Sequence, residues 1–185
     1  MCGIFGIVSD KTIGIKLYQG LKKLEYRGYD SSGIVGLTNS IKYKTIKAIG
    51  PIKNLKSKLK QISNVTTGIA HTRWATHGEP LLKNTHPHLS DKIAIVHNGI
   101  IENYETLKIF LKNKKYKFKS DTDSEIIAHL IDYHYKKSKD MKSSLIASVK
   151  KLEGNYAIGV INNDLPDKLY AACNGSPLII AKGKN

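Results

Sequence analysis

The sequence has 185 residues, 41% of them apolar, and a formal net charge of +15 at pH 7. This length favours a single domain with a full core, and two cysteines, Cys2 and Cys173, exclude a disulfide framework and a cysteine-rich zinc site. No apolar run reaches the roughly 20 residues of a membrane span, and the N-terminus lacks a basic signal region. We therefore expect a cytoplasmic protein that does not contact a membrane.

The positive charge comes from 28 lysines and only 2 arginines, spread along the whole chain. Proteins that bind phosphates and bases usually rely on arginine, so this pattern disfavours a nucleic-acid partner. The rarity of arginine makes Arg27 and Arg73 candidates for a special role. Because arginine carries a planar, always charged, two-pronged donor, we expect these two positions to need that geometry.

Hydrophobic periodicity predicts strands and helices in the first half of the chain. Short apolar runs indicate strands, and apolar residues at every third or fourth position indicate amphipathic helices. The predicted elements are a strand at Gly3–Ser9, a helix at Thr12–Leu24, a hairpin of Gly33–Leu37 and Ile41–Lys47 around Asn39-Ser40, a helix at Pro51–Ile62 and a strand at Thr67–Thr72.

The second half follows the same logic, with two helix starts suggested by capping residues. Asn103 is expected near the cap of one helix, and Thr122 with Glu125 matches a capping box for the next. The predicted elements are a strand at Lys92–Val96, a helix at Ile100–Lys112, a helix after Thr122, a helix at Met141–Leu152 and strands at Asn155–Ile161, Lys168–Cys173 and Pro177–Lys182.

Many of these strands are apolar on both sides. Two sheets stacked face to face, with helices outside, would bury both sides, so we predict an α+β sandwich. The chain has no internal repeat, linker or domain boundary, so residues 1–185 are interpreted as one domain. It stops just after an apolar strand, so we expect the domain to be incomplete at its C-terminal end.

Cys2 is the candidate nucleophile. Removal of Met1 would give one residue a thiol and a free α-amine, whose ordinary pKa values of about 8.5 and about 7.7–8.0 are nearly matched. Such a pair is a nucleophile with its own general base. Two alternatives remain open: Cys2 is a small apolar residue at the head of a strand, or it pairs with one of the seven histidines as in papain-like enzymes.

Two polar loops are candidate site walls. Glu25–Gly33 contains Arg27, and the stretch from Arg73 to Pro80 contains the only tryptophan, Trp74. A metal site at His86 and His88 is a weak alternative, because no convergent carboxylates accompany them.

Farther along, Asn98-Gly99 follows a strand but precedes a predicted helix, so a hairpin turn is not expected there. Asp123 falls in the first turn of another predicted helix, where its carboxylate can face a ligand.

Several motifs together resemble the glutaminase domain of glutamine–fructose-6-phosphate aminotransferases, a branch of the class II glutamine amidotransferases. The resemblance covers essentially the whole chain and rests on Met1–Ile4, EYRGYDSSG at Glu25–Gly33, HTRWATHGEP at His71–Pro80, HNGIIENY at His97–Tyr104, TDSE at Thr122–Glu125 and GSPL at Gly175–Leu178. It implies a four-layer α-β-β-α sandwich of the N-terminal nucleophile hydrolase type, with Cys2 at the end of a central strand. The sugar isomerase domains of that family are absent.

The resemblance also implies a role for each matching residue. Cys2 would be the nucleophile, and Asn98 and Gly99 would form the oxyanion hole. Arg73 would bind the α-carboxylate of glutamine and Asp123 its α-ammonium, while Thr76 and His77 would line the pocket. Arg27 and Trp74 would support the site.

The implied activity is hydrolysis of L-glutamine through a Cys2 thioester, without cofactor or metal. In a full-length enzyme the ammonia would convert fructose 6-phosphate to glucosamine 6-phosphate, and the missing domains would form a homo-oligomer. The alternatives are another class II amidotransferase, or a regulatory module that binds glutamine without turning it over.

Overall fold

The computed structural model describes residues 2–38, 42–74 and 79–183, which form two antiparallel four-stranded sheets packed face to face. The first sheet has the order β1-β4-β2-β3 and the second the order β5-β6-β7-β8. The strands are β1 (Gly3–Val8), β2 (Ser31–Leu37), β3 (Tyr43–Ile49), β4 (Thr67–Arg73), β5 (His88–Leu89), β6 (Ile93–Gly99), β7 (Tyr156–Asn162) and β8 (Leu165–Asn174).

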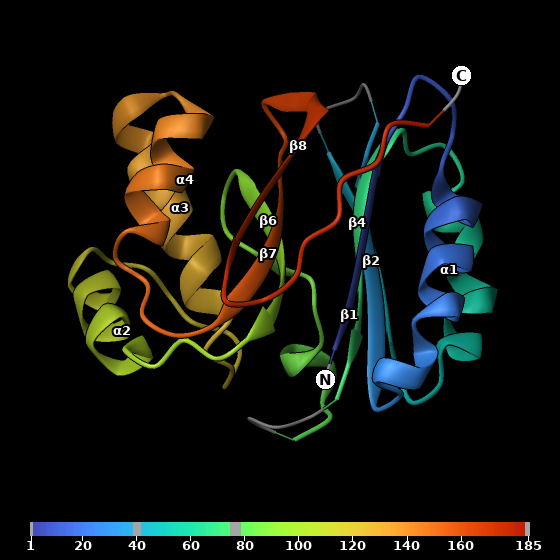
Figure 1. Cartoon of the computed structure of the whole chain (residues 1–185), viewed down its shortest axis with the longest axis horizontal. Coiled ribbons are helices and arrows are strands. Elements are labelled where there is room, and N and C mark those ends of the chain that lie inside the picture. The colour runs from blue at the N-terminus through green and yellow to red at the C-terminus, as the bar shows by residue number, and fades with distance from the viewer. Residues whose placement is uncertain (1, 39–41, 75–78, 184–185) are drawn as a thin grey trace.

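Helices cover the outer face of each sheet (Figure 1). The first sheet is covered by α1 (Gly14–Lys23) and the 3-10 helix η2 (Ile52–Ile62), and the second by α2 (Tyr104–Asn113), α3 (Glu125–Ser138) and α4 (Met141–Val149). Two short 3-10 turns, η1 (Glu25–Arg27) and η3 (Leu82–Asn84), lie in the connections. The predicted four-layer α-β-β-α sandwich is confirmed.

Each of the three interfaces between layers has its own apolar cluster. Leu17 of α1 and Leu55 of η2 pack on the first sheet, and Ile127 and Leu130 of α3 pack on the second. Between the sheets lies a cluster of Val35, Leu37, Ile69, Ala94, Val96 and Ile161. The strands β2, β6 and β7 are mainly apolar on both faces because both faces are buried, and this burial is how layered sheets gain most of their stability.

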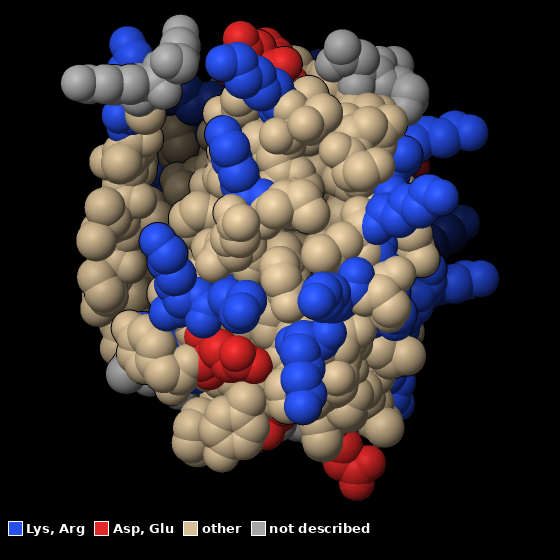
Figure 2. Space-filling model, turned by 90° about the vertical axis from the view of Figure 1, so that its right-hand side faces the viewer, with Lys and Arg blue, Asp and Glu red and all other residues tan. Residues whose placement is uncertain are grey.

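Lysine side chains are distributed over the face formed by α1 and η2, with a few acidic side chains among them (Figure 2). This agrees with the even spread of lysine along the sequence.

Several predicted elements differ from the structure in extent or type. The helix predicted at Pro51–Ile62 is a 3-10 helix, and the one predicted at Ile100–Lys112 begins only at Tyr104. The later start follows from backbone hydrogen bonds of Ile100 and Glu102 to the segment before β7, which hold residues 100–103 outside the helix. The helix predicted at Met141–Leu152 ends at Val149. The predicted turn at Asn39-Ser40 lies outside the described residues.

The strand predicted at Pro177–Lys182 is wrong. In the structure β8 ends at Asn174, and Ile179 and Ile180 are 90% and 84% exposed. An isolated apolar run becomes a strand only where another strand pairs with it, and no described strand pairs with this one. Cys173 lies near the end of β8 and is exposed.

Asn103 is the N-cap residue of α2, as predicted, whereas the capping box predicted at Thr122 and Glu125 is wrong. The Asn103 side chain makes no hydrogen bond to an α2 amide, because it donates to the Lys151 carbonyl and accepts from the Glu153 amide. Thr122 hydrogen-bonds His88, and α3 begins only at Glu125. In both cases a partner from a distant segment replaces the local helix amide.

Candidate active site

The register of the first sheet places Cys2 beside the end of β4. Gly3 is paired with Thr72, and the Trp74 amide donates to Cys2 Sγ at 3.4 Å. Cys2 Sγ in turn lies 3.8 Å from the Trp74 carbonyl oxygen. Cys2 therefore stands at the end of β1, as predicted, but β1 is an edge strand of the described sheet and not a central one.

The electrostatic surroundings of the Cys2 thiol act in opposite directions. Burial raises the pKa of the thiol, whereas the Trp74 amide and the charges of Arg73 and Arg27 lower it. Among the described residues no histidine hydrogen-bonds Cys2 Sγ. The described part of the chain therefore gives no support to the papain-like alternative.

The carbonyl group of Cys2 is held by two of the predicted site residues. Arg27 Nε donates to Cys2 O at 3.1 Å and Asn98 Nδ2 donates to it at 3.2 Å. Gly28 lets this loop approach closely, since a Cβ there would lie 2.7 Å from the Arg73 carbonyl carbon. Arg27 thus holds the backbone of Cys2, the candidate nucleophile.

Asn98 and Gly99 form the end of β6, in the second sheet. Gly99 has φ +140, a backbone conformation that residues with a side chain rarely adopt. A Cβ at this position would also clash with the Asn155 carbonyl. This position needs glycine for both reasons. The prediction that Asn98-Gly99 does not form a hairpin turn is confirmed, because the chain leads on to α2.

Arg73 and Asp123 bring opposite charges to the same recess as Cys2. A small cavity of about 30 Å³ is lined by Cys2, Arg73, Gly99 and Asp123, among others. Asp123 Oδ2 accepts from the Ile101 amide at 2.8 Å, which ties the α3 segment to the chain just after Gly99. The structure thus brings together residues from β1, β4, β6 and the start of α3.

The remaining predicted residues lie at the edge of this recess or outside the description. Trp74 lines the recess, is 44% exposed and packs edge-on against Tyr29 with ring centroids 5.5 Å apart. Thr76 and His77 lie outside the described residues.

A buried layer of four histidines adjoins the recess: His71, His86, His88 and His97, of which His86 and His97 also line it. The sequence indicated His86 and His88 only as a weak metal site and did not predict this layer. Each is at most 4% exposed, and the rings of His71 and His86 stack with centroids 3.9 Å apart. His71 Nε2 donates to the His97 carbonyl at 2.9 Å, across the interface between the sheets. The available signal was a single histidine within each of the strands β4 and β6.

Burial holds all four of these histidines neutral. It lowers the pKa of His71 and of His88 to about 3, that of His97 to about 4 and that of His86 well below its ordinary value. Neutral His97 connects to the site, because its Nδ1 lies 2.8 Å from Ser124 Oγ, which donates to Asp123. Within the described residues no group of three histidine, cysteine or acidic side chains is arranged to hold a metal ion.

Comparison with known proteins decides the family. A family profile described as glutamine amidotransferase domain matches residues 71–184. The chain belongs to the glutamine amidotransferase family. Within the described residues no helix has the length and apolarity needed to cross a membrane.

Curated relatives of this glutamine amidotransferase domain share about half of its residues. It is 50% identical over 186 residues to the glutamine–fructose-6-phosphate aminotransferase (isomerizing) of Buchnera aphidicola, covering 99% of this chain and 30% of the relative. It is likewise 50% identical over 187 residues to the enzyme of that name from Clostridium perfringens, covering 100% of this chain and 30% of the relative. The domain thus spans about 30% of the length of these relatives.

Solved amidotransferase structures share the fold. Glutamine phosphoribosylpyrophosphate amidotransferase from B. subtilis aligns with a TM-score of 0.74 and 28% identity, over 88% of this chain and 35% of that one. A structure described as the allosteric regulatory enzyme of purine biosynthesis aligns with a TM-score of 0.75 and 29% identity, over 88% and 36%. The sandwich is therefore the N-terminal nucleophile hydrolase fold of these amidotransferases.

Proposed function

We propose that this domain hydrolyses L-glutamine and that Cys2 is its nucleophile. The observation that carries the proposal is the convergence of Cys2, a buried arginine and a buried aspartate on one recess. Free glutamine has one carboxylate, one ammonium and a neutral carboxamide, so a thiol flanked by one cation and one anion matches it. The chemistry requires loss of Met1, because the α-amine of Cys2 is the base.

Binding would use the two charges. The Arg73 guanidinium offers a two-pronged donor to the α-carboxylate, and Asp123 offers a charge-assisted acceptor to the α-ammonium. Burial lowers the pKa of Arg73, while Cys2, Asp30 and Asp123 oppose this effect, and a guanidinium stays charged at neutral pH. Thr76 and His77 would complete the pocket.

Reaction would begin with attack of Cys2 Sγ on the carboxamide carbon. The thiol proton passes to the α-amine and then to the leaving nitrogen, so the C–N bond breaks, ammonia departs and a thioester remains. Asn98 Nδ2 and the Gly99 amide would donate to the oxyanion, and loss of one such donor typically costs about 2.7–4 kcal/mol of transition-state stabilisation. Water then cleaves the thioester, which releases glutamate and restores the thiol.

The names of the relatives suggest the use of the ammonia. In a protein of their length, a synthase part would transfer it to fructose 6-phosphate and form glucosamine 6-phosphate. That part would also carry the contacts of a homo-oligomer. By itself the present chain is expected to release glutamate only, and weakly.

The test uses an electrophilic glutamine analogue, 6-diazo-5-oxo-L-norleucine, followed by peptide mass spectrometry and an assay of glutamate release. We expect one adduct on Cys2, absence of Met1 from the labelled molecules and loss of glutamate release in Cys2→Ala. A second sample retains an N-terminal tag, which removes the free α-amine and should abolish turnover. Full activity of the tagged protein would refute the α-amine mechanism, and labelling at another residue would refute Cys2 as the nucleophile.

A further inference from the structure

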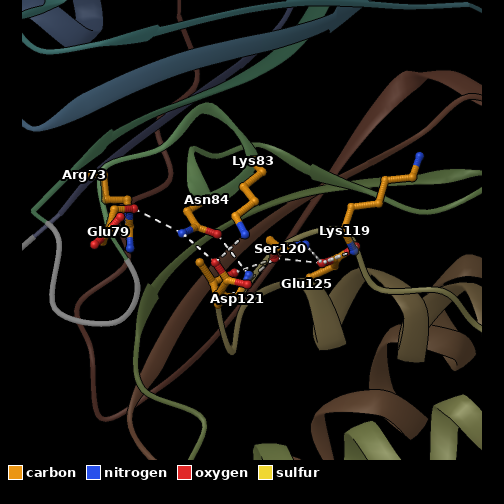
Figure 3. Close-up of polar contacts among 9 residues, drawn as sticks. Arg73, Glu79, Lys83, Asn84, Lys119, Ser120, Asp121 and Glu125 are labelled. Atoms are coloured by element: carbon orange, nitrogen blue, oxygen red, sulfur yellow. Dashed lines mark hydrogen bonds and ion pairs between the residues drawn. The ribbon is translucent and has the colours of Figure 1, made fainter.

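Asn84 is a fully buried amide at the end of η3 and lies outside the set of residues assigned to the reaction above. Its Nδ2 donates to the Glu79 carbonyl at 3.1 Å and to Asp121 Oδ2 at 3.2 Å. Its Oδ1 accepts from the Asp121 amide at 2.9 Å. Both donor positions and the acceptor of the side chain are therefore used, and they join two segments that are far apart in the sequence (Figure 3).

One end of this connection leads to the arginine of the recess. The Glu79 carbonyl that accepts from Asn84 also accepts from Arg73 Nη1 at 3.2 Å. The guanidinium, the Asn84 amide and the Leu81 backbone amide thus share one acceptor, and displacement of Asn84 would remove one of the bonds that hold the carbonyl in contact with Arg73.

The other end leads to the aspartate of the recess. Asp121 lies two residues before Asp123 and is also paired with Lys83 at 2.8 Å. On the far side of Asp123, the Glu125 carboxylate accepts from the Lys119 and Ser120 amides at 2.7–3.0 Å. Asp123 therefore sits in a short loop fixed by Asn84 at one point and by Glu125 at another.

We propose that Asn84 is a positioning residue that sets the separation of Arg73 and Asp123. The proposal rests on the function proposed above, in which these two side chains bind the α-carboxylate and α-ammonium of one glutamine. Because both groups are attached to the same carbon, the two side chains serve one ligand only at a defined separation. A misplacement of about 1 Å in such a site can cost on the order of 100-fold in rate.

The test compares wild type with Asn84→Asp, which keeps the shape but removes both N–H donors and places a carboxylate beside Asp121. We expect kcat/KM for glutamate release to fall about 10- to 100-fold, chiefly through KM. Iodoacetamide has neither the α-carboxylate nor the α-ammonium of glutamine. The rate at which it alkylates Cys2 in Asn84→Asp should therefore stay within about twofold of the wild-type rate. Selectivity for glutamine over 4-carbamoylbutanoate, which lacks the ammonium, should fall by at least about tenfold.

The matched control is Asn162→Asp. Asn162 is also fully buried, and its side chain accepts from the Asp164 amide, but it lies at the end of β7 remote from Gly99. It should lower stability without changing KM or selectivity. If Asn84→Asp does not fold, Asp121→Ala at the exposed partner tests the same connection and should raise KM in the same direction. Unchanged KM and selectivity in both variants, or equal changes in Asn162→Asp, would overturn the proposal.

Direct binding separates this proposal from the proposed function. Glutamine binding is measured by calorimetry in Cys2→Ala with and without Asn84→Asp. If Cys2→Ala binds glutamine at least about tenfold more tightly than the Cys2→Ala, Asn84→Asp double variant, the positioning role of Asn84 is supported. This holds even if wild type releases no glutamate, and in that case only the proposed turnover is refuted. Absence of glutamine binding in Cys2→Ala would overturn both proposals.

Discussion

At the scale of single residues, the two arginines are the most informative positions. In a chain with 28 lysines, arginine occurs only at Arg27 and Arg73, and both contact the candidate site. Arg27 holds the backbone of Cys2, the proposed nucleophile, and Arg73 lines the recess. A lysine at either position would keep the charge but lose the fork geometry.

Arg73→Lys tests that distinction. We expect KM for glutamine to rise about 10- to 100-fold with a smaller change in kcat, since a single ammonium replaces a two-pronged contact to the carboxylate. Steady-state glutamate release measures both constants. Arg27→Lys is the matched control, and it should act on kcat because it contacts Cys2 and not the ligand. An unchanged KM in Arg73→Lys would contradict its assignment to the carboxylate.

Gly99→Ala tests the backbone of the proposed oxyanion hole. The φ of +140 and the nearby Asn155 carbonyl both oppose a Cβ, so we expect a loss of about 1–3 kcal/mol in the free energy of unfolding. Urea titration measures this loss, and glutamate release should be nearly abolished. Gly183→Ala is the control, because a Cβ there meets nothing within 4 Å. A fully active Gly99→Ala protein would exclude the Gly99 amide as an oxyanion donor.

At the scale of elements, the start of α3 shows how a helix end can organise a site. Periodicity placed this helix correctly, and the carboxylate of Glu125 does fold back over its start. It binds the amides of residues 119 and 120, and Thr122 is left to contact His88. The sequence Thr122–Glu125 thus has the form of a capping box, but in the structure the Glu125 side chain connects the preceding loop to the helix.

Glu125→Gln tests this anchor. Burial raises the pKa of Glu125, but the His129 ring 3.4 Å away and hydrogen bonds from Ser120 and Lys119 outweigh it and bring the pKa to about 2. A folded-state pKa below the ordinary value contributes stability above pH 4.5 that is lost as the pH falls toward 2. Urea titration at pH 7 should show a loss of about 1.5–3 kcal/mol in Glu125→Gln and little change in the exposed Glu105→Gln. Equal losses in the two variants would show that the carboxylate is not the anchor.

At the scale of the whole molecule, the histidine layer between the sheets makes stability depend on pH. The pKa values of about 3 to 4 for His71, His88 and His97 lie below the ordinary 6.5. The unfolded chain therefore binds more protons between about pH 6.5 and pH 4, so stability is fully present above pH 6.5 and falls as the pH falls through this window. Each such histidine contributes up to about 1.4 kcal/mol per pH unit.

Urea titrations at several values between pH 7.5 and pH 4.5 measure this dependence. We expect the free energy of unfolding to fall steadily over the window. His86→Phe, which removes one buried titrating group with no hydrogen-bond partner among the described residues, should make the slope shallower. The half-buried His134→Phe is the control and should change the slope less. A stability that is constant from pH 7.5 to pH 5 would contradict neutral burial of this layer.

The layers were predictable from sequence because apolar periodicity reports burial directly. Strands such as β2 and β6 are apolar on both faces. Few architectures bury both faces of a strand, and stacked sheets between helices are one of them. The apolar run at 177–182 shows the limit of the same argument. It has the composition of a strand, yet strand formation depends on a neighbour, which composition does not reveal.

The sequence by itself determined the chemistry that is available: a cysteine directly after Met1, two rare arginines, an Asn-Gly that does not form a hairpin and an aspartate near a helix start. These were visible because each departs from a local expectation. Only the tertiary structure decided how they meet, through the register that sets Cys2 beside Trp74 and through Asn84 and the histidines that join distant segments. The physical reason is that hydrogen bonds between segments dozens of residues apart leave no periodic trace in the sequence.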